Sequence, residues 1–471
     1  MIEIYKNKKI YLLMVVGGLV GSMACFTGNW AIIIVAGIIL LLTTLLNPKF
    51  GVFILLFLQL GLIKSTSGLT NQETIFIIFF GSTIIGWILR QLLKKKTRIS
   101  WSPINLPVLS FLSFCVFSFV KASYNNISIV NWFTEWRAFL VLILFFVILN
   151  EFKSKKELKW LIYSFLLITL LICLRDIFLF IQQGGFERLF KAAGLQYASL
   201  FFIMAIPFSI TIFLTAKNFL LKWSQIPLIL ICAFRLLIGL MRSYILAILS
   251  MLTVFIVILL ILKILKNKKI FSRAVTLITL ICIISGIIFL IFPTQMNKII
   301  KNNITRFVVL KNFSSPKNVS ALTHAIEIKA AWKYAIKQPL LGHGFGFKYQ
   351  YYRPNQKFVD GAIVHFVPLF FILKIGFIGT LSIIWLITTI LMLNWQIFKK
   401  EKDLSWKLLE IAIFSNFIGF IILSFFVTNV IRIDSIFYFT LATGIIATIK
   451  KIQDKTNTTL NPIIRIKNCG Q

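Results

Sequence analysis

The sequence has few acidic residues, few histidines and no paired cysteines. Its 471 residues include 14 Asp and Glu against 50 Lys and Arg, and only three histidines. None of its six cysteines forms a CxxC pair, and five lie in apolar segments, so we expect small core residues rather than a disulfide framework. The sequence also lacks zinc-ligand spacing and a Walker loop. These absences argue against a zinc module and a P-loop nucleotide site.

Apolar residues make up 59% of the chain, well above the roughly 45–50% of a soluble protein. They gather in runs long enough to cross a membrane. We therefore predict an all-α polytopic membrane protein with about 12–14 transmembrane helices. The predicted spans lie near residues 10–26, 30–46, 50–63, 75–93, 104–121, 137–150, 159–181, 195–216, 226–241, 243–263, 273–293, 376–397, 407–430 and 435–449.

The formal charge of +36 has a topological interpretation. Most basic residues lie in short loops that alternate along the chain, and these loops fall on one side of the predicted membrane. Lys and Arg mark the cytoplasmic side. We therefore expect both termini in the cytoplasm and no nucleic-acid partner.

One loop, residues 294–364, breaks this alternation and lies on the outer side by parity. It carries eleven Lys and Arg against Glu327 and Asp360. Long loops are exempt from the charge rule, so the charge is a candidate for function. The expected layout is residues 1–293 with eleven spans, this periplasmic loop, residues 365–450 with the last spans, and a cytoplasmic tail at 451–471.

All three histidines, His324, His343 and His365, fall within this loop or at its end. Histidine is the side chain best suited to move protons near neutral pH. The simpler interpretation is that they only tolerate a polar interface. We favour a functional role for at least one of them.

Arginines inside apolar segments are the second signal. Arg235 and Arg242 are seven residues apart and so point from nearly the same helical face. Guanidinium groups bind phosphates bidentately, and intramembrane charges are functional candidates. Arg175 is followed by Asp176, which fits a structural ion pair equally well. Arg242 has the alternative of snorkelling to the interface.

Residues 319–338 show apolar positions at helical spacing with a stripe of lysines, which predicts an amphipathic helix on the membrane surface. Pro339-Leu-Leu-Gly-His-Gly-Phe-Gly346 follows it. Amides at Gly342 and Gly344 are candidates to approach an anion, although many glycine turns bind nothing. We expect a short helix at 365–373 with a break near Gly376 before the next span.

These features together resemble the bacterial O-antigen ligase and O-antigen polymerase family. The specific part covers roughly residues 235–397, with Met241-Arg242-Ser243, the proline-glycine block and His365 before a Gly-Phe-Ile-Gly segment. The resemblance implies a polytopic glycosyltransferase that acts at the periplasmic face of the bacterial inner membrane. Its partners would be an undecaprenyl pyrophosphate-linked glycan donor and a lipid A-core or lipid-linked glycan acceptor, within membrane lipid and without a cofactor or metal.

The resemblance maps the family's essential histidine onto His365 and its membrane-end arginine onto Arg242. The position of a second family arginine holds His324 here, which leaves open whether His324 or Arg306 meets the pyrophosphate. The family's usual His-Asn pair is also replaced, by His365-Phe366. We expect His365 and Arg242 to be catalytic, with Arg235, His324, Arg306, Gly342 and Gly344 on the pyrophosphate.

Three functions remain open at this point. A ligase would join the glycan to lipid A-core, whereas a polymerase would join repeat units to each other. A flippase or transporter of lipid-linked glycan would place ionisable groups near the bilayer midplane instead. The clustering of charge at the outer end favours an enzyme. No Asp-x-Asp or Glu-x-Asp occurs on the outer side, so a metal-dependent site has no obvious ligands.

Overall fold

The structure is a computed structural model that describes residues 30–60, 70–93, 99–182, 199–238, 242–297, 300, 301, 304, 319–352 and 358–468. The predicted first span at 10–26 lies outside these residues. The α-helices are α2 (Trp30–Leu46), α3 (Pro48–Leu58), α4 (Asn71–Leu93), α5 (Asn105–Tyr124), α6 (Ile129–Leu140), α7 (Leu144–Glu151), α8 (Lys155–Gln182), α9 (Ser199–Thr215), α10 (Phe219–Trp223), α11 (Gln225–Ile238), α12 (Arg242–Ile261), α13 (Lys268–Ile291), α15 (Val319–Ala335), α16 (Val367–Lys400), α17 (Leu404–Ser424) and α18 (Ile433–Asn468).

Within the described residues, ten helical segments are long and apolar enough to cross a membrane, and three shorter apolar helices accompany them. This confirms the prediction of an all-α polytopic membrane protein. Polar caps set where some of these helices begin. The Asn267 side chain accepts from the amides of Lys269 and Ile270, and the Asp403 side chain accepts from the amide of Ser405. Both caps follow basic loops and satisfy amides that the helix itself leaves unpaired.

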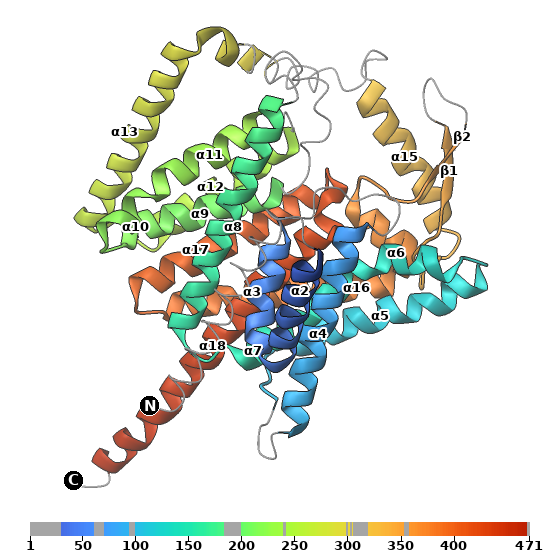
Figure 1. The fold of residues 1–471 in the computed structure, drawn as a ribbon, viewed down its shortest axis with the longest axis horizontal. Helices are drawn as coiled ribbons and strands as arrows, with labels where there is room; N and C mark the ends of the chain where they lie inside the picture. The colour runs from blue at the N-terminus through green and yellow to red at the C-terminus, as the bar shows by residue number, and fades with distance from the viewer. Residues whose placement is uncertain are drawn as a thin grey trace.

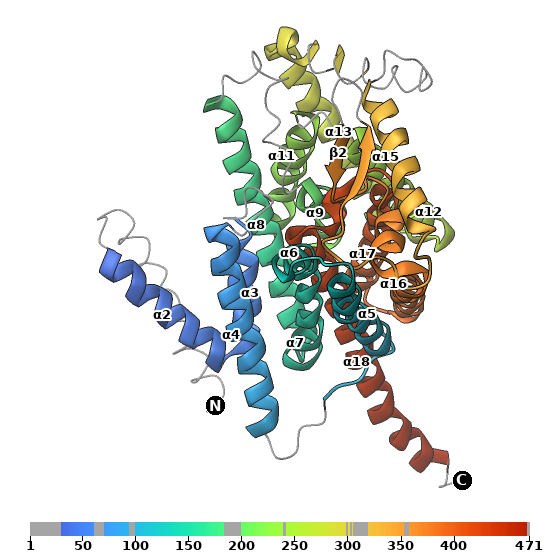
Figure 2. The same ribbon diagram turned by 90° about the vertical axis from the view of Figure 1, so that its right-hand side faces the viewer.

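The helices form a bundle with α9, α11, α12 and α17 on one side and α5, α6 and α16 on the other (Figures 1 and 2). Helix α16 packs against both α17 and α5, and α18 packs against α7. Of the most apolar window of α18, 94% is buried inside the protein, against 6% for α13. The α18 segment is therefore core, whereas α13 stands at the edge of the bundle (Figure 1).

The long loop carries more structure than the predicted helix. Helix α15 ends at Ala335, and two strands that the sequence did not predict follow, β1 (Tyr349–Tyr352) and β2 (Phe358–Gly361). They pair antiparallel with Tyr349 opposite Gly361. Figures 1 and 2 show α15 and this hairpin side by side at one end of the bundle. The hairpin returns the chain from α15 to the start of α16.

Helix α16 is broken at Gly376, where φ is +71°, so the predicted break is confirmed. Only glycine adopts this conformation without strain, and a Cβ there would lie 2.1 Å from the Leu340 carbonyl oxygen. Two carbonyls before the break and two amides after it, which a continuous helix would pair with each other, pair with residues 339–344 instead. These bonds are His343 N to Leu373 O, Gly344 N to Lys374 O, Phe377 N to Pro339 O and Ile378 N to Leu340 O.

Candidate functional site

His365 lies just before α16 and faces the helix α15. Its Nδ1 is 2.8 Å from Oε2 of Glu327, and its side chain is 46% exposed. Glu327 is only 2% exposed. The Tyr349 hydroxyl, from β1, lies 3.0 Å from the other oxygen of Glu327 and 3.1 Å from the Ile363 carbonyl oxygen, so these two acceptors share its single proton. A buried carboxylate thus holds one nitrogen of a half-exposed imidazole.

His324 completes this group from the same helix as Glu327. Its Nδ1 is 3.5 Å from Oε2 of Glu327, and its ring centroid is 4.3 Å from that of His365. Burial alone would raise the pKa of Glu327, but the contacts with both histidines and with Tyr349 outweigh burial and lower that pKa to about 2. Glu327 is therefore a carboxylate at neutral pH. The structure brings together the predicted His324 and His365.

The donor atoms of His324, Glu327 and His365 all lie within 4.8 Å of one another, so these side chains could hold a metal ion. Two ligands of one tetrahedral zinc ion lie about 3.3 Å apart, given bonds near 2.0–2.1 Å. The 2.8 Å between His365 and Glu327 is shorter and matches a hydrogen bond. In this geometry Glu327 is hydrogen-bonded to His365 and Tyr349, and His324 lies beside it at an ion-pair distance of 3.5 Å.

His343 is unlike the other two histidines, because it is 5% exposed and its ring stacks on Phe347 with centroids 4.1 Å apart. Its Nε2 is 2.8 Å from the Tyr334 carbonyl oxygen. Burial lowers the pKa of His343, and nearby lysines lower it further, although the bond to Tyr334 acts in the opposite direction. His343 is thus a neutral packing residue. It lies outside the group of His324, Glu327, Tyr349 and His365, which we call the open cluster.

Arg242 is the first residue of α12, and the start of this helix lies at the same end of the bundle as His365. Two contacts of the segment that follows α17 make this connection. Asn429 donates to the Tyr244 hydroxyl at 2.8 Å, and the Phe366 ring packs on Phe425 with centroids 5.7 Å apart. The other predicted pyrophosphate residue from the loop, Arg306, lies outside the described residues.

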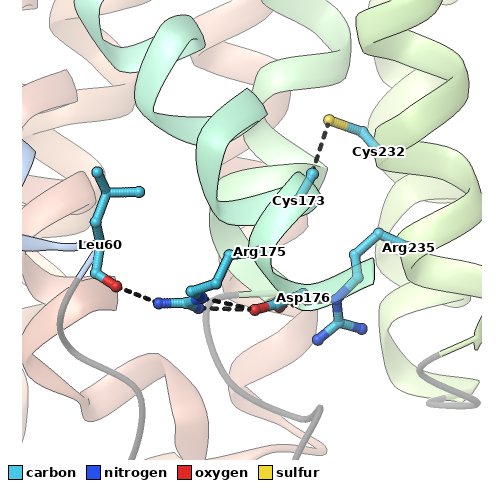
Figure 3. A network of polar contacts seen from close by, with 6 residues as sticks. All are labelled: Leu60, Cys173, Arg175, Asp176, Cys232 and Arg235. Carbon is cyan, nitrogen blue, oxygen red and sulfur yellow. Dashed lines mark hydrogen bonds and ion pairs between the residues drawn. The ribbon is translucent and has the colours of Figure 1, made fainter. Parts of the chain in front are cut away.

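Arg235 lies in a separate polar network between α8 and α11 (Figure 3). Its Nε is 2.8 Å from Oδ2 of Asp176, while Arg175 binds Oδ1 of the same carboxylate at 2.8 Å and donates to the Leu60 carbonyl. Arg235 is 1% exposed and packs over the Phe202 ring. The structure therefore shows the Arg175–Asp176 ion pair that the sequence left open, and it adds Arg235 to that pair.

The amides of Gly342 and Gly344 already have partners, because they donate to the carbonyls of Gln338 and Lys374 at 3.0 and 2.9 Å. Both glycines are buried with positive φ, and a Cβ on either would lie 2.6 Å from backbone of α16 or α5. An anion could reach these amides only after those bonds broke. The glycines therefore pack residues 339–344 against α16, and the anion contact expected from the sequence stays a prediction.

A buried ion pair fixes the same junction. Lys374 is 0% exposed, and its Nζ is 2.8 Å from Glu135 of α6 and 2.6 Å from the Phe347 carbonyl. Glu135 also accepts from the amide of Gly346 at 2.7 Å. These bonds tie α6, the glycine block and α16 together. The start of α16, which directly follows His365, is thus anchored to α6 and to the glycine block.

Glu327 and Tyr349 are the site residues that the sequence reasoning missed. In the sequence, Glu327 stands out only as one of the two acidic residues of a basic loop. The available signal was spacing, because His324 and Glu327 are three residues apart on a predicted helix and such residues share a face. Tyr349 had no signal, because its place depends on the hairpin.

Residues 227–384 match the family model described as O-antigen ligase. This range includes α12, α15 and the start of α16, and with them every residue of the open cluster. A comparison with curated proteins finds no match. The family match confirms the resemblance seen in the sequence, and with the ten apolar helices it indicates a multi-pass bacterial membrane protein.

Proposed function

We propose that this chain, whose residues 227–384 are those of the O-antigen ligase and polymerase family, transfers a glycan from undecaprenyl pyrophosphate to lipid A-core. Transfer would occur at the periplasmic face of the inner membrane, with both termini in the cytoplasm. The observation that carries the proposal is His365, whose ring is 46% exposed while Glu327 holds its Nδ1. An exposed imidazole with one nitrogen fixed is suited to act as a general base.

In the proposed reaction, Nε2 of His365 takes the proton of an acceptor hydroxyl. The hydroxyl oxygen forms a bond to the anomeric carbon of the donor glycan from the side opposite the pyrophosphate. The bond from that carbon to the pyrophosphate oxygen breaks, and its electron pair leaves with the lipid pyrophosphate. Direct displacement of this kind inverts the anomeric carbon.

Cations must stabilise the charge that develops on the departing pyrophosphate. Arg242, at the start of α12, is our candidate for this contact, with His324 or Arg306 from the loop. Arg235 is bound to Asp176 in the separate network between α8 and α11, so we propose that it makes no direct phosphate contact. The eleven Lys and Arg of the loop favour an anionic lipid substrate through their positive charge.

The proposed chemistry has no metal or cofactor step. A base and fixed cations supply the two requirements of the displacement, proton removal and charge stabilisation. The carboxylate of Glu327 is engaged with His365 and Tyr349, which supports its role as a hydrogen-bond partner.

The test uses purified protein in detergent with an undecaprenyl pyrophosphate-linked glycan, with lipid A-core or a second donor molecule as acceptor, and with a chelator present. His365→Ala is compared with His343→Gln, which removes a histidine that lies outside the open cluster. We expect product on lipid A-core from the wild type and from His343→Gln, and loss of at least about 10²-fold in His365→Ala.

The other outcomes separate the remaining functions. Longer lipid-linked chains, lost in His365→Ala, would make the protein a polymerase and contradict the choice of acceptor. Equal product from wild type and His365→Ala would overturn the assignment of the base. Loss of activity in the chelator alone would contradict the metal-free mechanism. An inactive wild type that moves lipid-linked glycan across vesicles would be a transporter.

A further inference from the structure

Glu327 connects three elements of the loop. It lies on α15, accepts from Tyr349 of β1 through Oε1, and meets His365 at the start of α16 through Oε2. Tyr349 is itself fixed by its bond to the Ile363 carbonyl, two residues before His365. Both carboxylate oxygens are therefore held in place, at 3.0 and 2.8 Å from their partners.

This arrangement selects one tautomer of His365. An ionised carboxylate only accepts hydrogen bonds, so Nδ1 of His365 must carry the proton that lies between them. A neutral His365 then has its lone pair on Nε2. Among the residues that the structure describes, none hydrogen-bonds Nε2. The nitrogen with the lone pair is the one left open on a half-exposed ring.

We propose that Glu327 is the positioning residue of the transfer reaction, holding His365 in the orientation and tautomer in which Nε2 is the base. This inference rests on the proposed function of His365. Tyr349 supports the carboxylate from the other side. Among the described residues, the titratable groups that face His365 are Glu327 and His324 from α15, with Tyr349 behind Glu327.

The two histidines lie at different distances from Glu327. His365 is the closer to Glu327, at 2.8 Å, and His324 is the more distant, at 3.5 Å. The negative charge of Glu327 therefore balances positive charge that arises on either ring during turnover. When His365 takes a proton from the acceptor, it becomes a cation beside a carboxylate that is already in contact. No reorganisation of the loop is needed at that step.

The kinetic test compares wild type with Glu327→Gln and Tyr349→Phe. Glu327→Gln keeps the shape of the side chain but removes its charge and allows its amide to donate to the imidazole. We expect kcat to fall on the order of 10²-fold with little change in KM. Tyr349→Phe should give a smaller fall in kcat.

A spectroscopic test needs no activity. The chain has three histidines, so ¹⁵N-histidine labelling gives three imidazoles to resolve by NMR in detergent or lipid. At alkaline pH, His365 should carry its proton on Nδ1 in the wild type and populate both tautomers in Glu327→Gln. His343 is an internal reference, because its Nε2 faces the Tyr334 carbonyl and so must carry the proton there.

The two tests separate failure of the function from failure of the inference. A wild type without transferase activity, but with His365 in the Nδ1–H form, would overturn the proposed function and leave the tautomer assignment standing. An Nε2–H form of His365 in the wild type would overturn the inference. So would a Glu327→Gln variant that loses activity with an unchanged tautomer of His365, since that pattern marks a merely structural role.

Discussion

Two carboxylates in this protein each contact two basic side chains, and the surroundings of the two carboxylates differ. Asp176 lies between Arg175 and Arg235 inside the helices, where Arg235 is 1% exposed. Glu327 meets His324 and His365 on the loop, and these histidines are 39% and 46% exposed. The first network joins groups that stay charged at every accessible pH. The second contains imidazoles, the side-chain type best suited to move protons in catalysis.

The comparison separates a charge used for architecture from a charge used for chemistry. Asp176 neutralises guanidinium groups that the helices have removed from water, so its contribution is to stability. Glu327 orients rings that remain open on one side, so its contribution is to what those rings can do. The burial and the chemical type of the basic side chains, guanidinium or imidazole, distinguish the two networks better than the carboxylates do.

The buried network of Arg175, Asp176 and Arg235 is called the closed network below. The largest expected effect comes from removing its carboxylate. Asp176→Asn keeps the size of the side chain and leaves two guanidinium groups without their counter-charge. Loss of one partner from a buried ion pair costs about 3–5 kcal/mol. We expect a marked fall in the thermal unfolding midpoint in detergent. The matched control is Asp454→Asn, in a pair with Lys450 four residues away, for which a loss below about 1 kcal/mol is expected. Equal midpoints for the two variants would contradict a structural role for Asp176.

The two networks also differ in how far the sequence predicted them. Arg175 and Asp176 are adjacent, so the sequence named their ion pair as one option. It placed Arg235 with the pyrophosphate, because nothing local indicates that α8 and α11 face each other there. Hydrophobic periodicity predicts helices but does not say which faces meet.

At the open cluster, local sequence located the histidines but not their partner. Glu327 and His365 are 38 residues apart, and their contact depends on the hairpin that returns the chain. The break at Gly376 was predictable because glycine interrupts an apolar span. The sequence could not predict that residues 339–344 fill the break, because this depends on four hydrogen bonds between distant segments.

Acid should weaken the open cluster in a defined pH window. The pKa of Glu327 is lowered from 4.5 to about 2 in the folded protein, so its ionised form adds stability above about pH 4.5. This stability is lost as the pH falls through 2, and it amounts to at most about 3 kcal/mol. We expect the unfolding midpoint of the wild type to fall from pH 4.5 to 2.5 more steeply than that of Glu327→Gln. Parallel curves for the two proteins would contradict the ion-pair geometry.

The smallest effect is expected at His343, and it tests whether exposure or residue type marks the chemistry. His343 is a histidine in surroundings like those of the closed network, because it is 5% exposed and stacked on Phe347. Burial and nearby lysines lower its pKa, so protonation is unfavourable in the folded protein, and stability on this account falls as the pH drops below about 6.5. His343→Gln should remove this slope in unfolding midpoint between pH 7 and 5 and leave kcat within about 3-fold of wild type, far from the 10²-fold loss of His365→Ala. A loss in His343→Gln as large as in His365→Ala, with the fold intact by its unfolding midpoint, would mean that openness to solvent is not what separates catalytic from structural histidines in this loop.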